Sequence, residues 1–156
     1  MKLAEAFVFG EQLGWINPHI VDEPEKIAYL KKVVALRYKF RDLFYEGRMG
    51  RPPQPVGAMP RMTADWNFMG PTITTTDVVR AGLWYNEDKS NKRALLLFAN
   101  CSPEEVQCDW TIDFSECGFE TFKVTRHDAD GTETLIDELP QTFTFKPLEV
   151  FVLELR

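Results

Sequence analysis

Residues 93–100 read Arg-Ala-Leu-Leu-Leu-Phe-Ala-Asn, and residues 94–99 within them are apolar without interruption. A strand that is apolar on both faces has to be covered on both sides, so we expect this stretch at the centre of a sheet. A few residues later, apolar Val106, Cys108, Trp110 and Ile112 alternate with polar residues. This period of two predicts a strand with one wet face, with Cys108 and Trp110 pointing into the core.

Short β-rich runs separated by turn residues fill the rest of the chain from residue 72 onward. The turns are expected at 86–91, 129–131 and 139–140, where Asn, Asp, Gly or Pro gather. The expected strands are 74–85, 93–100, 106–114, 119–127, 132–136, 142–145 and 148–155. Because no helical pattern lies between them, residues 72–156 are predicted to form an antiparallel β-sandwich or a related Greek-key sheet.

A long helix is predicted from Pro24 to Glu46. Asp22 or Glu23 can cap its start, Pro24 suits a first turn that needs no amide donor, and Gly47 can end it. Residues 3–9 ahead of it are a short apolar run, a helix or a strand, and we favour the helix.

The apolar residues of the predicted long helix form two stripes. At about 100° per residue they cover an arc of roughly 220°, about twice the width that docking on a single surface requires. The helix should therefore have two partners. The stripes consist of Ile27, Leu30, Val34, Tyr38 and Tyr45, and of Tyr29, Val33, Leu36, Phe40 and Leu43.

Residues 51–71 are rich in proline and are predicted to be an irregular connection that drapes over another surface. The chain then divides into a helical segment (1–50), a Pro-rich connection (51–71) and a β-sandwich domain (72–156). The fold class is α+β, with a long N-terminal helix preceding an antiparallel β-sandwich.

The composition excludes several functional classes. A net charge of −6 argues against binding to nucleic acid, and no apolar run of about 18 residues would span a membrane. The first residues lack the pattern of a signal peptide, so the cytoplasm is the default location. Three cysteines without metal-ligand spacing and two distant histidines predict neither a metal site nor a cofactor.

The order of these segments resembles a known family. The apolar strand ending in Asn100, the strand at 106–112 and the terminal run Lys146-Pro147-Leu148-Glu149-Val150-Phe151-Val152-Leu153-Glu154-Leu155 resemble the β domain that follows the barrel in glycoside hydrolases of the α-amylase and α-galactosidase kind. The first fifty residues, with Gly10-Glu11-Gln12-Leu13-Gly14-Trp15 and the long helix, resemble the last segment of such a (β/α)8 barrel.

The resemblance implies that the chain itself is inactive. Glycosidases of this kind carry two carboxylates on different barrel strands, and the chain would hold at most the last of the eight strand-loop units. We therefore expect no catalytic residue here. The expected role is that of a non-catalytic accessory domain, structural in a carbohydrate-active parent protein.

The best candidate for a sugar-binding site is the loop at 11–19. Glu11, Gln12, Asn17 and His19 could form hydrogen bonds with sugar hydroxyls, and Trp15 could stack on a pyranose ring. In the competing interpretation Trp15 packs under the helix and the polar residues are solvated. We favour this interpretation because the chain does not contain the barrel that would complete a sugar site.

Two further possibilities remain open. An independent carbohydrate-binding module would need exposed aromatic rings, and Trp84, Tyr85 and Trp110 are the available ones. Trp110 belongs to the core face of its strand, and only one of Trp84 and Tyr85 can be exposed, which is too few for a convincing platform. The partner of the helix would be either the barrel portion of a parent protein or a second copy of the chain, because one sheet cannot cover both stripes.

Overall fold

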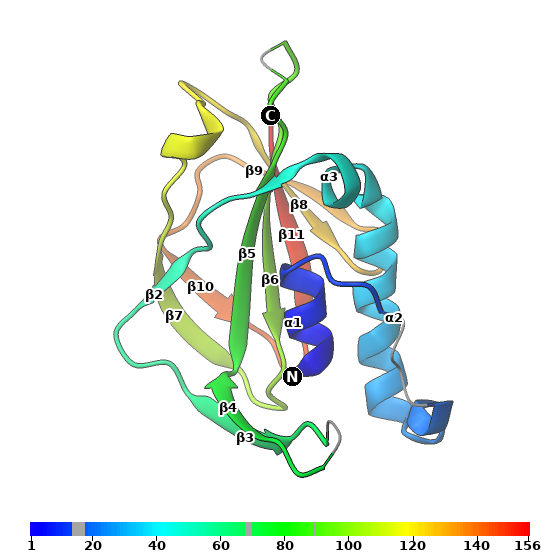
Figure 1. The fold of residues 1–156 in the computed structure, drawn as a ribbon. Coiled ribbons are helices and arrows are strands. Elements are labelled where there is room, and N and C mark those ends of the chain that lie inside the picture. Colours follow the sequence, from blue (N-terminus) through cyan, green and yellow to red (C-terminus); the bar gives the residue numbers. More distant parts are fainter. Residues whose placement is uncertain (14–17, 68–69, 89) are drawn as a thin grey trace.

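The computed structural model describes residues 1–13, 18–67, 70–88 and 90–156. They form a mixed α+β fold that is mostly β (Figure 1). The helices are α1 (Lys2–Val8), the 3-10 helix η1 (Pro18–Asp22), α2 (Pro24–Lys39), α3 (Arg41–Glu46) and the 3-10 helix η2 (Ser115–Cys117). The strands are β1 (Arg48–Met49), β2 (Gln54–Val56), β3 (Arg61–Asp65), β4 (Ile73–Asp77), β5 (Val79–Tyr85), β6 (Ala94–Asn100), β7 (Val106–Thr111), β8 (Val124–Asp128), β9 (Glu133–Ile136), β10 (Thr142–Phe145) and β11 (Val150–Leu155).

Within the described residues the strands form three antiparallel sheets. The large sheet has six strands in the order β1-β5-β6-β11-β8-β9. A smaller sheet has the order β10-β7-β2, and β3 and β4 form a separate two-stranded sheet. The predictions of an α+β fold and of antiparallel sheets are confirmed.

Strand β6 occupies the centre of the large sheet, as its apolar sequence predicts. It pairs with β5 on one side and with β11 on the other, and all of its residues are buried. In β7 the predicted alternation is also confirmed, because Val106, Cys108 and Trp110 are buried while the residues between them are exposed or half-buried.

Aromatic side chains join the small sheet to one face of the large sheet. Phe98 of β6 lies against Trp110 of β7 with a centroid distance of 5.3 Å, and against Phe143 and Phe145 of β10 at 5.1 and 5.6 Å. Phe151 of β11 lies in the same cluster, 5.3 Å from Phe98. The largest rings of the core are therefore gathered between these two sheets.

The helices cover the other face of the large sheet (Figure 1). Val8 of α1 packs closely on Gly82 of β5, where a Cβ atom would come within 2.6 Å of the Val8 carbonyl oxygen. From α2, Tyr29, Val33 and Leu36 are buried in the same core. This is the second of the two predicted stripes.

The prediction of one long helix is wrong, because the helix is interrupted at Phe40. That residue has φ −108° and ψ 22°, so α2 ends before it and α3 begins after it. Its ring is buried and packs edge-on against His127, with a centroid distance of 5.0 Å. Neither Gly nor Pro marks the break, so tertiary packing overrides local helix propensity here.

Residues 51–71, predicted to be an irregular connection, contain two strands. β2 pairs with β7, which places Pro55 opposite Trp110, and β3 pairs with β4. Proline is tolerated in β2 because it is an edge strand of the small sheet. Part of the connection thus belongs to the sheets.

Candidate functional site

The structure describes three of the five residues of the predicted sugar-binding loop. Glu11 and Gln12 are exposed just after α1, and the exposed His19 lies in η1 with its Nδ1 3.3 Å from Oδ2 of Asp22. Trp15 and Asn17 lie outside the described residues. Both interpretations of the loop therefore stay predictions.

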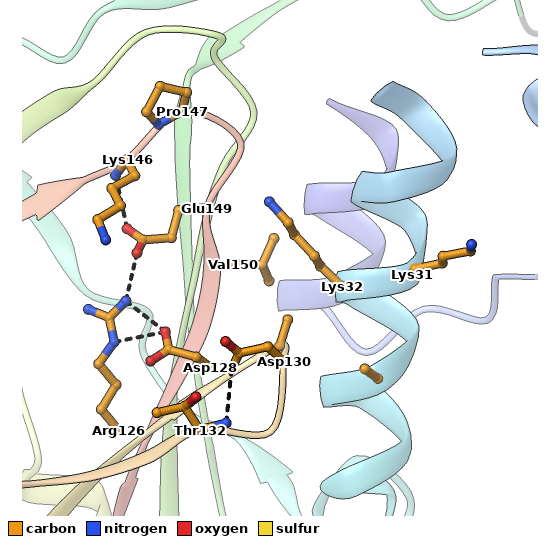
Figure 2. Close-up of a pocket in the computed structure, with 12 residues that line it drawn as sticks. Lys31, Lys32, Arg126, Asp128, Asp130, Thr132, Lys146, Pro147, Glu149 and Val150 are labelled. Atoms are coloured by element: carbon orange, nitrogen blue, oxygen red, sulfur yellow. Dashed lines mark hydrogen bonds and ion pairs between the residues drawn. The ribbon is translucent and has the colours of Figure 1, made fainter. Parts of the chain in front are cut away.

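A different region has the shape of a site. An open cleft of about 660 Å³ lies between α2, the β8–β9 turn and the segment that leads into β11 (Figure 2). Its lining combines charged side chains with a few small apolar ones. The lining residues are Lys31, Lys32, Ala35, Arg126, Asp128, Ala129, Asp130, Thr132, Lys146, Pro147, Glu149 and Val150.

Arg126 of β8 is the centre of the polar groups in this cleft. Its Nε and Nη2 donate to Oδ1 of Asp128 at 2.9 and 2.8 Å, and Nη2 also donates to Oε1 of Glu149 at 2.7 Å. The guanidinium lies 4.0 Å from the centroid of the Phe151 ring. Burial disfavours its charge, but the hydrogen bonds and charges of Asp128 and Glu149 outweigh that effect and raise the pKa of Arg126.

Backbone contacts hold the two turns that frame the cleft. Oδ1 of Asp130 accepts a hydrogen bond from the Thr132 amide at 2.9 Å, and this bond is the main reason that the pKa of Asp130 is lowered. On the other side, Oε2 of Glu149 accepts from the Lys146 amide at 2.9 Å. Both carboxylates therefore stabilise their own turns.

Helix α2 is tied to the second turn by a lysine. Nζ of Lys32 donates to the Leu148 carbonyl oxygen at 2.8 Å, and Leu148 has a positive φ of 51°. Lys31, one position earlier, points away from the two turns (Figure 2). The lysines of α2 therefore do not converge on one point in the cleft.

The two carboxylates that share Arg126 are poorly placed for acid-base catalysis. Asp128 and Glu149 both accept hydrogen bonds from Nη2 of Arg126. A catalytic acid or base needs an oxygen that can reach the substrate, whereas both oxygens of Glu149 and one oxygen of Asp128 already accept hydrogen bonds from within the chain. The geometry favours a structural or binding role for these groups.

A second polar cluster, which the sequence did not reveal, lies on the opposite face of the large sheet. Only 4% of His127 and 6% of Glu154 are exposed, and Nε2 of His127 lies 3.1 Å from Oε2 of Glu154. Arg93 forms ion pairs with both Glu154 and Asp42, and Arg156 donates to Glu154 at 2.9 Å. The signal in the sequence was a glutamate within the apolar run 150–155.

The ionisation of Glu154 follows from these partners. Burial opposes the charged form, but hydrogen bonds from His127, Arg93 and Arg156 lower the pKa of Glu154 to about 2. The cluster closes the corner between α2 and α3, because Phe40 covers His127 and Asp42 of α3 reaches Arg93. The cluster therefore stabilises the packing of α2 and α3 on the large sheet.

In the described ranges, no three His, Cys, Asp or Glu side chains are grouped as a metal site would require. None of the described helices is long and apolar enough to cross a membrane.

Comparisons with models of protein families, with curated proteins and with solved structures gave no match.

Proposed function

We propose that this chain is a non-catalytic accessory domain of a glycoside-hydrolase-like protein, with a structural role in a carbohydrate-active parent. The family part of the proposal rests on the sequence resemblance of residues 93–100 and 146–155. The non-catalytic part rests on one observation, the sharing of a single Arg126 nitrogen by Asp128 and Glu149.

The chemistry of glycosidases explains why this observation matters. One carboxyl group protonates the leaving oxygen, and the second acts as base or nucleophile from the other side of the scissile bond. Here the guanidinium of Arg126 occupies the space between the two carboxylates, where a sugar would have to bind. Because Arg126, Asp128 and Glu149 pair with one another, they contribute to the rigidity of the domain.

The architecture we propose for this accessory domain is an antiparallel β-sandwich with an outer helical layer. The contacts of Phe98 with Trp110, Phe143 and Phe145 support it, since they join the two sheets face to face. The helices α1 and α2 then form a third layer on the large sheet (Figure 1).

Hydrolysis assays test the non-catalytic role. We expect the purified chain to turn over none of a panel of aryl glycosides. Turnover that is lost in Asp128→Asn or Glu149→Gln, or in Glu11→Gln, would contradict the proposal. Leu135→Ser is the matched control, because Leu135 is an exposed residue of β9 outside the cleft and the loop.

An independent carbohydrate-binding module is the alternative, and the open cleft favours it. Its lining offers donors on Arg126 and Lys146 and acceptors on Asp128 and Glu149, groups that can bind sugar hydroxyls. The aromatic platform is weak, as the sequence pattern predicts. Trp110 is buried, and the Trp84 indole donates to the Val8 carbonyl oxygen at 2.9 Å.

Titration calorimetry with oligosaccharides separates the two functions. The structural role predicts no saturable binding. Binding that weakens in Asp128→Asn and Lys146→Ala would establish the module and locate it in the cleft, whereas loss in Glu11→Gln or Trp15→Ala would locate it in the predicted loop. The Leu135→Ser chain should behave as the unmodified chain in either case.

A further inference from the structure

The surface of α2 that faces away from the sheet carries an apolar stripe. Ile27, Leu30, Val34 and Tyr38 follow one another at intervals of three and four residues, which places them on one side of the helix. We call these four residues the outer stripe. Val34 is 45% exposed and Tyr38 67% exposed, while Ile27 and Leu30 are half-buried.

The outer stripe is not part of the core of this chain. The core side of α2 is formed by Tyr29, Val33 and Leu36, which are buried against the large sheet. The opposite side of α2 faces outward (Figure 1). The structure therefore decides which of the two predicted stripes is left for a partner.

Opposite charges lie at the two ends of the outer stripe. Glu23, the N-cap residue of α2, lies four residues before Ile27, and its carboxylate is 51% exposed. At the other end the Arg41 guanidinium lies 4.3 Å from the centroid of the Tyr38 ring and donates to the Tyr38 carbonyl oxygen. The stripe thus runs from an acidic end to a basic end.

We propose that the outer stripe binds a second copy of this chain, with the two α2 helices antiparallel about a two-fold axis. A stripe with opposite charges at its ends is complementary to itself only in the antiparallel direction, where Glu23 of one copy approaches Arg41 of the other. The axis passes midway between these residues, and Leu30 of each copy then faces Val34 of the other.

The neighbouring charges are compatible with this arrangement. Lys31 is exposed and flanks the stripe near the axis, and its long flexible side chain can turn sideways so that its ammonium stays in water. Lys26 forms an ion pair with Glu23 within the same helix. The Glu23 carboxylate can accept from Arg41 of the second copy as well, because a carboxylate has several acceptor positions.

The contact surface of the proposed dimer is small. Helix α2, Pro24–Lys39, is about 24 Å long at 1.5 Å per residue, and one helix of this length buries less area than the roughly 800 Å² per partner of a standard interface. We therefore expect a weak, reversible dimer that dissociates on dilution.

The first test is sedimentation equilibrium of the full chain over a series of micromolar concentrations. The mass should rise from 18.0 kDa towards twice that value. Val34→Ser and Tyr38→Ser should each weaken the dimer by about tenfold or more, since both remove apolar area at the interface. The control Ile73→Ser removes an equally exposed apolar residue from β4 and should change nothing.

Charge exchange tests the antiparallel direction. Glu23→Arg and Arg41→Glu should each weaken the dimer by repulsion, and the double variant should restore it because the cross-chain pair is rebuilt with its signs reversed. Thermal unfolding of each variant shows whether it still folds. A monomer at every concentration, a dimer insensitive to Val34 and Tyr38, or a double variant that is not restored would overturn the proposal.

Discussion

Arg93 and Arg126 each lie between two carboxylates, but in different surroundings. Arg126 pairs with Asp128 and Glu149 in an open cleft, whereas Arg93 pairs with Glu154 and Asp42 beneath the corner of α2 and α3. Burial of the carboxylates makes the difference, because the Glu154 side chain is 8% exposed and the Asp128 side chain 28%, and an ion that is cut off from water depends on its protein partners. The Arg93 cluster should therefore matter far more for stability than the Arg126 cluster.

The largest effect is expected for Glu154→Gln. The change leaves the shape intact but removes the charge that Arg93, Arg156 and His127 face, and breaking such a buried pair costs about 3 kcal/mol of the free energy of unfolding. Urea unfolding measures it. A loss no larger than that of Asp128→Asn would contradict the contrast between the two clusters.

The contribution of Glu154 to the free energy of unfolding should depend on pH. Because the pKa of Glu154 is about 2 in the folded chain and about 4.5 in the unfolded chain, its contribution is fully present above pH 4.5. It is then lost as the pH falls towards 2, and it amounts to about 3 kcal/mol. Urea midpoints at a series of acidic pH values should fall less steeply for Glu154→Gln than for the unmodified chain.

Asp128→Asn should have a smaller effect. Arg126 keeps Glu149 as an ionic partner and is reached by water from the cleft, so we expect a loss of about 0.5–1 kcal/mol. The urea unfolding experiment used for Glu154→Gln measures it. A loss of several kcal/mol would mean that the Arg126 ion pairs are as well shielded from water as those of Arg93.

The smallest effect is expected for Lys39→Met. This change removes the charge that pairs with the exposed Glu133 but keeps an apolar stem over the Phe40 ring. Its thermal midpoint should lie close to that of the unmodified chain, and the remaining difference should vanish in about 0.5 M salt, where exposed charges are screened. A difference that persists in salt would indicate that Lys39 belongs to the buried cluster.

The strands were predictable wherever a periodic pattern marked them. β6 was predicted from an apolar run and begins one residue after its expected start. β7 was predicted from a strict alternation and ends three residues before its expected end. β2 and β3 were missed because the proline content of residues 51–71 predicts irregular backbone. Their pairing with β7 and β4 depends on partners that lie far along the chain.

The two polar clusters could not be predicted from local sequence. Arg126 and Glu149 are 23 residues apart, and Asp42 and Arg93 are 51 apart. No motif spacing connects such residues. Within β8, Arg126 and His127 belong to different clusters only because neighbouring residues of a strand point to opposite faces.

The sequence by itself determined the apolar centre of the sheet, the antiparallel α+β class and the two apolar stripes of the helical segment, because periodicity and burial are linked by geometry within a few residues. Only the tertiary structure decided where the helix breaks, which stripe is buried and which carboxylates share an arginine. Phe40 has no local reason to leave the helix, and its position depends on packing against His127. Contacts between residues distant in the chain set these features, so they emerge only when the helices and the sheets have packed together.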